Sequence, residues 1–345
     1  MEYYDKINIY VPAKIKQQLD NDAQRFEIFK GDHLTLNRNR FLTMVLCGYY
    51  DRFTQEHQLS YDSILAILTR AIPSRAKAAE YARAIMSAVL SPEIPKRKGR
   101  NPDRISFKPT VETAGIIADI QNRLAAGDYV SQVLCRLLVS FCNNPMSERE
   151  MILFNDSVEA INKAISHGQT ISFSLIWDET TRHDVTPFAI ARSQEEMYNY
   201  LVCVEYNVNG GAPLVRSYRL NRITNILSGP KAPSLSEDLR HLCERTVHIS
   251  PQYAINTDET ICVKLTDAGE KLYNRIYYGR PPYIQKEQSP DGLGQYYYFQ
   301  CSLDQVFHYF RRFDNNTAVI VSPMSEKTRM MQFHKRALEA YLPPE

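Results

Sequence analysis

Residues 214–223 read LVRSYRLNRI, and this stretch decides how the rest of the chain is interpreted. Alternation along a strand divides its side chains between two faces: Arg216, Tyr218 and Leu220 against Val215, Ser217 and Arg219. With Arg222, three arginines lie within seven residues, interleaved with an aromatic ring. Guanidinium groups hold anions through paired N–H donors and also stack on rings. The pattern predicts a site for a nucleic-acid backbone or a nucleotide; the alternative is an edge strand whose arginines are simply solvated.

The predicted contact residues come from this strand and from neighbouring segments: Arg216, Arg219, Arg222, Tyr200 and Tyr218, with Arg182 and His183 at the rim. Because Arg216 and Arg219 alternate to opposite faces, a turn or bulge before Arg222 is needed to bring some of these groups together. One of the three arginines can instead be structural, bonded to a loop carbonyl.

Composition points to an ordinary globular protein, with 44% hydrophobic and 23% charged residues. The net charge is only +2, so any contact with nucleic acid has to come from local patches. Seven cysteines without a CxxC pair predict reduced thiols in a cytoplasmic protein. Cys243, with His241 and His248 nearby, lacks a second cysteine at zinc spacing, so we expect no metal site. The N-terminus does not look like a signal peptide, and no apolar run is long enough to cross a membrane.

Two segments about a hundred residues apart share one plan. Residues 6–12 (KINIYVP) and 104–110 (RISFKPT) alternate strictly, and each precedes two amphipathic helices. We predict that the two strands pair antiparallel within one chain and bury Ile7, Ile9, Ile105 and Phe107. The outward side chains are polar or basic and form a second candidate binding surface: Lys6, Asn8, Tyr10, Arg104, Ser106 and Lys108. Strand, helix, helix in this order resembles the ribbon-helix-helix fold.

The remaining segments have simpler patterns. Helices are expected over residues 61–72 and 74–90, followed by a linker over 91–103 that holds Lys96, Arg97, Lys98 and Arg100. A long helix is expected over 147–167 and a connector over 228–252. From residue 259 the order βαββαβ resembles a ferredoxin-like unit, with the aromatic run at 296–299 in its core.

Residues 161–226 resemble a WYL domain, a small Sm-like β-barrel of bacterial regulators. The matching pieces are AINKAISHGQTISF (160–173), RHDVTPFAI (182–190), YNYLVCVEYN (198–207) and VRSYRLNRI (215–223). The last is similar to the family signature Arg-x-Phe-Arg-Leu-Asp-Arg-Ile. The chain departs from the family at Asn199, where the Trp of the naming triplet is expected, at Leu175 in place of an aromatic residue, and at Asn221 in place of Asp.

These segments predict an α+β multidomain protein. Residues 1–146 form a tandem ribbon-helix-helix-like domain with a helical insert, 147–230 the WYL domain, and 231–345 a C-terminal extension. In the family that this order resembles, such extensions often assist dimerisation.

The domain order resembles the WYL accessory proteins of type VI-D CRISPR systems. That resemblance implies a homodimer that binds single-stranded RNA and enhances an RNA-guided CRISPR RNase effector. The alternative is a regulator that binds duplex DNA through the ribbon and senses a nucleotide-like ligand in the WYL domain. We expect no enzymatic activity and no cofactor, because the sequence lacks a Gly-rich phosphate loop, HExxH, GxSxG and clustered carboxylates. Arg329 and His334 have a spacing like that of some helical ribonucleases, but their separation puts them on different helix faces.

Overall fold

The computed structural model describes residues 5–32, 34–90, 104–123, 129–206, 211–314 and 316–341. The chain folds into two compact units, Met1–Asp156 and Ser157–Glu345. The predicted basic linker at residues 91–103 lies outside the described residues.

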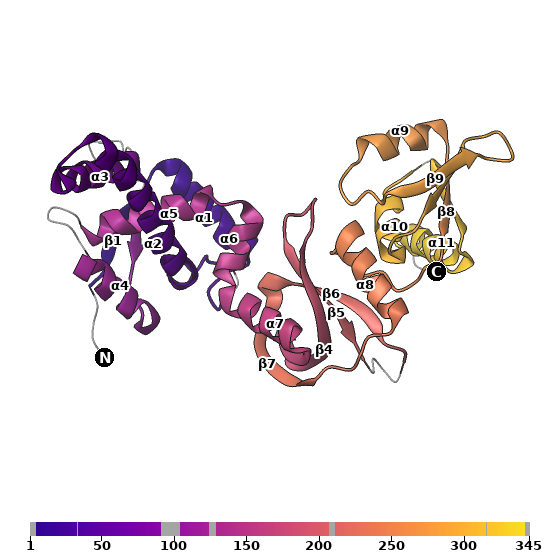
Figure 1. Ribbon diagram of the computed structural model, residues 1–345. Coiled ribbons are helices and arrows are strands. Elements are labelled where there is room, and N and C mark those ends of the chain that lie inside the picture. Colours follow the sequence, from indigo (N-terminus) through magenta and orange to yellow (C-terminus); the bar gives the residue numbers. More distant parts are fainter. Residues whose placement is uncertain are drawn as a thin grey trace. The chain divides into compact units, whose positions relative to one another are not determined.

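The first unit contains an antiparallel two-stranded ribbon, β1 (Ile7–Tyr10) and β2 (Arg104–Phe107) (Figure 1). Partners across the ribbon include Ile7 with Phe107 and Ile9 with Ile105. Three of these four side chains are buried, and that of Ile7 is half-buried. Alternation of apolar and polar residues therefore turns one face of the ribbon to the core. The predicted pairing of the two strands within one chain is confirmed.

Each strand of the ribbon leads into two helices, so the strand–helix–helix order occurs twice. The helices are α1 (Ala13–Arg25) and α2 (Arg38–Ala71) after β1, and α4 (Val111–Arg123) and α5 (Val130–Asn143) after β2. The apolar faces of α2 and α5 meet in the core, where the rings of Phe41 and Phe141 pack edge-on with centroids 6.2 Å apart. The predicted internal repeat is confirmed.

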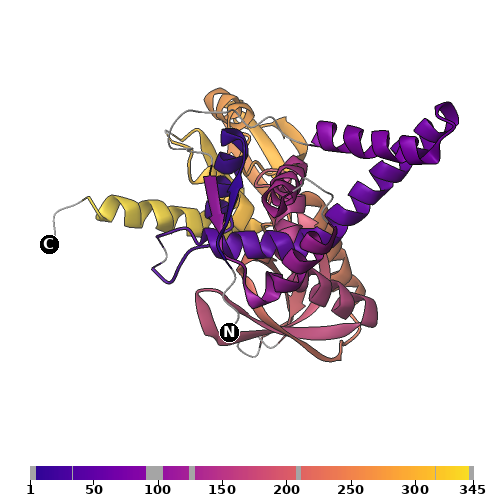
Figure 2. The ribbon, with the colours of Figure 1, turned by 90° about the vertical axis from the view of Figure 1, so that its left-hand side faces the viewer.

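α2 is a single helix of 34 residues, whereas the sequence pattern predicted two. The intervening residues 54–60 (TQEHQLS) contain neither Gly nor Pro, so nothing ends the helix there. α3 (Arg75–Leu90) follows α2 after a short turn. Figure 2 shows α3 and the end of α2 that leads into it projecting together from the rest of the first unit.

The prediction of one long helix over residues 147–167 is wrong, because the structure has two helices in this range. α6 (Met146–Leu153) and α7 (Asn155–His167) are separated at Phe154, which leaves helical geometry with φ −109° and ψ 32°. The Phe154 ring packs edge-on against Phe26 of the first unit, with centroids 6.3 Å apart. This contact holds the Phe154 side chain at the junction between α6 and α7.

The second unit begins with α7 and a five-stranded antiparallel sheet in the order β6-β5-β4-β3-β7. Its strands are β3 (Gln169–Leu175), β4 (Asp178–Arg192), β5 (Asn199–Glu205), β6 (Leu214–Arg219) and β7 (Ile223–Lys231). Among the described residues no hydrogen-bonded ladder joins β6 to β7, so barrel closure stays a prediction. β6 is an edge strand, as the simpler interpretation of its sequence expected.

The connector predicted over residues 228–252 is instead the end of β7 followed by a helix, α8 (Glu237–Ile249). Ser236 begins this helix by accepting a hydrogen bond from the Leu239 amide, as an N-cap serine commonly does. The buried Cys243 of α8 packs against Val202, Val204 and Val215 of the sheet. The Pro and Ser residues before the helix concealed its apolar periodicity.

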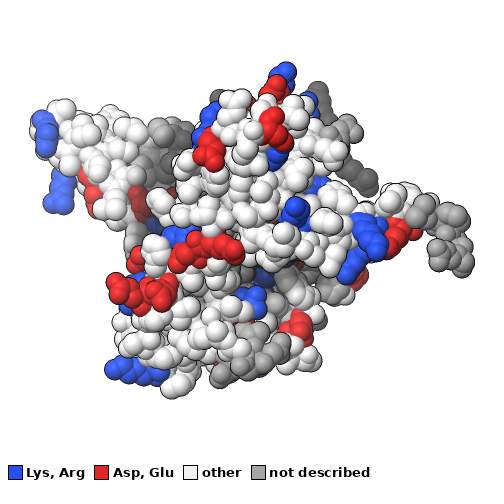
Figure 3. Space-filling model, turned by 90° about the vertical axis from the view of Figure 1, so that its right-hand side faces the viewer, with Lys and Arg blue, Asp and Glu red and all other residues white. Residues whose placement is uncertain are grey.

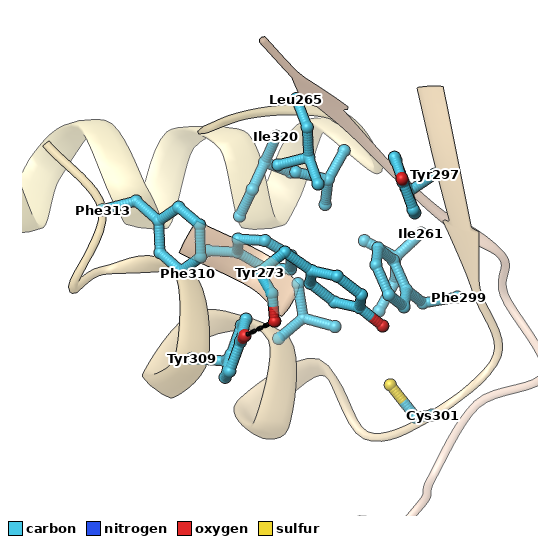
Figure 4. Packing of buried hydrophobic residues seen from close by; sticks show 12 residues of the cluster. Ile261, Leu265, Tyr273, Tyr297, Phe299, Cys301, Tyr309, Phe310, Phe313 and Ile320 are labelled. Atoms are coloured by element: carbon cyan, nitrogen blue, oxygen red, sulfur yellow. Dashed lines mark hydrogen bonds between the residues drawn. The ribbon is translucent and has the colours of Figure 1, made fainter. Parts of the chain in front are cut away.

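A second sheet follows, in the order β11-β8-β10-β9, with all neighbours antiparallel. Its elements are β8 (Ile261–Leu265), α9 (Asp267–Arg275), β9 (Tyr283–Gln288), β10 (Gln295–Phe299), α10 (Leu303–Phe310), β11 (Ala318–Ser322) and α11 (Met324–Glu339). This is the predicted βαββαβ order. Tyr297 and Phe299 point into an aromatic core in which the Tyr309 hydroxyl donates to the Tyr273 carbonyl at 3.1 Å (Figure 4).

All seven cysteines lie in the described ranges, and each carries a free thiol. No helix in the described ranges combines the length and the apolar character needed to cross a bilayer.

Candidate nucleic-acid interface

The arginine strand β6 ends in a 3-10 turn, Leu220–Arg222, which leads directly into β7. Val215 and Leu220 are buried. The turn is the change of direction that the sequence required before Arg222. It does not bring the three arginines together, because each guanidinium lies beside a different aromatic or acidic partner.

Arg216 belongs to a compact cluster on one face of the sheet, here called the Glu205 cluster. Its members come from four adjacent strands: Phe173, His183, Glu205, Arg216 and Tyr218. Glu205 is its polar centre, with Oε1 3.1 Å from His183 Nδ1 and Oε2 accepting from Arg216 Nε at 3.2 Å. The His183 ring stacks on Phe173 with centroids 5.5 Å apart. Strand register places Tyr218 opposite Leu201 and Arg216 opposite Cys203, so both side chains share this face.

Tyr218 closes the cluster. Its hydroxyl lies 3.2 Å from His183 Nδ1 and donates to Glu205 Oε2 at 3.4 Å, and its ring packs edge-on against Phe173 at 5.0 Å. Burial, aided by the nearby Cys203 and Glu205, raises the pKa of Tyr218 above its ordinary value. The phenol therefore stays protonated at neutral pH and acts as a hydrogen-bond donor.

Glu205 was not among the residues predicted from the sequence, and it changes what the cluster can do. One carboxylate and one guanidinium offset each other, so a phosphate has to compete with Glu205 for Arg216. The Arg216 side chain is 40% exposed, against 16% for Glu205. The guanidinium is thus the accessible member of the pair. Only strand register, which places the end of β5 beside His183 and Arg216, reveals this carboxylate.

Arg219 lies on the other face. Its guanidinium carbon sits 3.4 Å from the centroid of the Tyr198 ring, and its Nε is buried without a hydrogen-bond partner. It pairs in register with Tyr200, which is buried and whose hydroxyl donates to Glu196. The structure therefore brings Tyr218 and His183 to Arg216, and places Tyr200 and Arg219 elsewhere.

The other two predicted residues of this domain lie near the β3–β4 turn. The Arg222 guanidinium stands over the ring of Trp177, 4.4 Å from its centroid, and Trp177 was missed by the sequence reasoning. Arg182 donates to the carbonyls of Ser172 on β3 at 2.9 Å and of Asn225 on β7 at 3.0 Å. Arg182 thus has a structural role: its hydrogen bonds link β3 and β7, although its side chain is exposed.

The second candidate surface lies on the ribbon of the first unit. All of its residues are exposed except the half-buried Ser106: Lys6, Asn8, Tyr10, Arg104, Ser106 and Lys108. The Ser106 hydroxyl donates to Asn8 Oδ1 at 2.9 Å, which leaves the Asn8 amide nitrogen available as an outward donor. At the end of β2, the side chain of Asn39 accepts from the Lys108 amide at 2.8 Å and donates to its carbonyl at 3.0 Å. α2 therefore holds the ribbon in place.

Charges elsewhere are mixed. On the face drawn in Figure 3, basic and acidic side chains are interspersed, and neither sign forms a continuous field. Arg329 of the Arg329–His334 pair lies 2.7 Å from Asp304 and is also paired with Glu326, so it is engaged in ion pairs within its own region. Contact with a polyanion has to rely on the local clusters described above.

No family model matches the sequence, and no curated protein matches it. The solved structures that match this chain include the following two. One is described as the crystal structure of a CRISPR Cas-related protein; it is 20% identical, covers 99% of this chain and 95% of its own, and gives a TM-score of 0.64. The other is proteasome accessory factor B/C (PafBC) of Arthrobacter aurescens, with 15% identity, 99% coverage of this chain and 52% of its own, and a TM-score of 0.26, too low to compare folds. The chain therefore shares its fold, along nearly its whole length, with a CRISPR Cas-related protein.

Proposed function

We propose that this protein is a non-catalytic accessory protein that binds single-stranded RNA and enhances an RNA-guided CRISPR RNase of type VI-D. The observation that carries the proposal is the shared fold with a CRISPR Cas-related protein across 99% of the chain. Two further features support it. Segments that resemble a WYL domain follow one another along one sheet, and that sheet presents an accessible arginine beside aromatic rings.

The proposal includes a closed Sm-like barrel for the WYL domain and a homodimer formed through the C-terminal extension. α11 supports the second point. Met324, Met331 and Leu338 recur at seven-residue spacing on this helix and are 67%, 64% and 63% exposed. An exposed apolar stripe of this period is typical of a helix that packs against a partner helix.

The first expected result concerns the nucleic acid. At one fixed salt concentration the protein binds a labelled single-stranded RNA more tightly than a duplex DNA of the same length, because unpaired bases expose ring faces and polar edges that a duplex hides. Fluorescence anisotropy measures both affinities. Cleavage of a reporter RNA by a type VI-D effector, with and without the protein, tests enhancement. Tighter binding to the duplex, or an unchanged cleavage rate, would contradict the proposal.

A DNA-binding regulator remains the second candidate, and the ribbon is the observation that favours it. β1 and β2 pair as a two-stranded ribbon with basic and polar side chains outward, an element that fits a major groove. In this alternative the WYL domain senses a ligand and controls binding by the ribbon.

Replacing Asn8 and Ser106 together with alanine separates the two candidates. These residues carry the polar groups suited to base edges, so in a DNA regulator the change relaxes sequence preference. In the proposed RNA accessory protein the double variant keeps nearly all of its RNA affinity. Competition binding with scrambled duplexes and with single-stranded RNA measures both properties. Loss of RNA binding in the double variant would move the main site to the ribbon.

A further inference from the structure

The turn between β3 and β4 has an unusual composition. Leu175 pairs with Asp178, so Ile176 and Trp177 are the two central residues of a tight hairpin loop. Both are exposed, Ile176 by 37% and Trp177 by 57%. Trp177 is the only tryptophan in the chain. A large aromatic side chain is therefore held in solvent at the tip of a hairpin.

The hairpin itself does not require these residues. Two-residue hairpin loops favour Asn-Gly and similar pairs, whose positive φ values match the twist of the strands. Neither Ile176 nor Trp177 has a positive φ. Turn geometry therefore does not explain two apolar residues here, whereas a contact made outside the fold would explain them.

The position of Trp177 is fixed by the 3-10 turn that follows β6. The Ile176 amide donates to the Arg222 carbonyl at 3.0 Å, which ties the hairpin tip to this turn. The Arg222 guanidinium then covers one face of the indole ring at 4.4 Å. Since the residue is still 57% exposed with that face covered, the opposite face and the ring edge remain open to solvent.

The charged groups around the ring suit a nucleotide. Asp178 follows Trp177, but its carboxylate accepts from the Thr180 hydroxyl at 2.8 Å and from the Thr181 amide at 3.2 Å. These hydrogen bonds lower the pKa of Asp178 and turn its charge toward its own strand. The guanidinium of Arg222 is thus the charge directly over the ring, and it is the group that attracts a phosphate.

We propose that the open face of Trp177 is a stacking platform for one unpaired nucleobase of single-stranded RNA, with Arg222 on the opposite face of the ring. The site deepens the proposed function and rests on it. Stacking tolerates any base, because every base has a π-face, but it requires that the base be free of its own helix. The platform therefore selects single strands over duplexes and adds an apolar contact to the electrostatic one.

The sole tryptophan provides a direct readout. Selective excitation of Trp177 reports this turn alone, and stacking of a base quenches its emission. We expect quenching on titration with a short oligoadenylate RNA. An abasic phosphodiester of equal length keeps the backbone charge but has no bases, and it is expected to bind more weakly without quenching. A blunt RNA duplex is likewise expected to leave the emission unchanged.

Substitutions complete the test. Trp177→Ala is expected to weaken oligoadenylate binding about tenfold, whereas Trp177→Phe keeps most of the affinity because it keeps a ring. Tyr277→Ala removes a 74% exposed aromatic side chain from another part of the unit and serves as the matched control. If oligoadenylate binds without quenching and Trp177→Ala keeps wild-type affinity, the proposal that Trp177 stacks on a base is contradicted, whereas the proposal that the protein binds RNA is not. If no single-stranded RNA binds, the proposed function and the platform both fail.

Discussion

Asp22→Ala is expected to lower the free energy of unfolding of the first unit by about 3–5 kcal/mol, because it leaves a buried guanidinium without its partner. Asp22 on α1 and Arg149 on α6 form a two-point ion pair, with Nε–Oδ2 at 2.6 Å and Nη2–Oδ1 at 2.9 Å. Their side chains are only 4% and 8% exposed. Arg149 also donates to the Asn144 carbonyl at 2.6 Å. The pair thus joins α1 of the first strand–helix–helix copy to α6, the helix that follows the second copy.

Urea denaturation followed by helical circular dichroism measures this effect, and the fluorescence of Trp177 reports the second unit separately. Arg38→Ala is the matched control: it breaks the ion pair between Arg38 of α2 and Asp20 of α1, whose side chains are 56% and 29% exposed. Its cost is expected to be a small fraction of that of Asp22→Ala, because solvent screens exposed pairs. Asp22→Leu combined with Arg149→Met restores part of the loss by removing both charges. Equal costs for Asp22→Ala and Arg38→Ala would contradict the assignment.

The largest expected effect on binding comes from removing Arg216 and Arg222 together. Each phosphate contact that is lost reduces the salt dependence of binding by about 0.7 to 1 unit of slope. At about 0.1 M salt this corresponds to roughly fivefold to tenfold in affinity per contact, and to roughly 25- to 100-fold for two. The Arg216→Ala/Arg222→Ala variant is therefore expected to bind single-stranded RNA that much more weakly, as measured by fluorescence anisotropy.

Glu205→Gln provides the opposite change at the same place. Glutamine keeps the shape of the side chain and its capacity to bond His183 and Tyr218, but it no longer holds Arg216 by charge. We expect tighter binding of single-stranded RNA, because the phosphate no longer competes with a carboxylate for the guanidinium. Unchanged or weaker binding in this variant would show that Arg216 pairs with Glu205 in the folded protein and does not contact the RNA.

The sequence was informative wherever a local pattern determines the structure. Strict alternation in two short segments predicted that Ile9 and Ile105 face one core, and the structure pairs them directly. From residue 259 the predicted order of strands and helices, βαββαβ, is the order observed, with α9 and α10 as its two helices. Helix ends were less predictable: α2 runs past the polar residues at 54–60 because no Gly or Pro stops it.

The candidate site was only partly predictable, because it depends on register between distant strands. Arg216, Tyr218 and His183 were predicted and meet in one cluster. Glu205, which meets them there, looks like an ordinary strand end until β4, β5 and β6 are aligned. Trp177 carried a signal that was available from the sequence: a lone tryptophan in the short gap between two predicted strands. Its pairing with Arg222 depends on the β3–β7 ladder, which only the fold reveals.

The most direct test of RNA binding by the arginine strand is the affinity for single-stranded RNA, measured at several salt concentrations for the wild type and for Arg216→Ala, Arg219→Ala and Arg222→Ala singly. We predict that Arg216→Ala and Arg222→Ala weaken binding and flatten the salt dependence by about 0.7 to 1 unit each. Arg219→Ala is expected to change neither, because its guanidinium is directed to Tyr198 on the other face of the sheet. Wild-type affinity and slope in all three folded variants would contradict the assignment of this strand as the RNA-binding site.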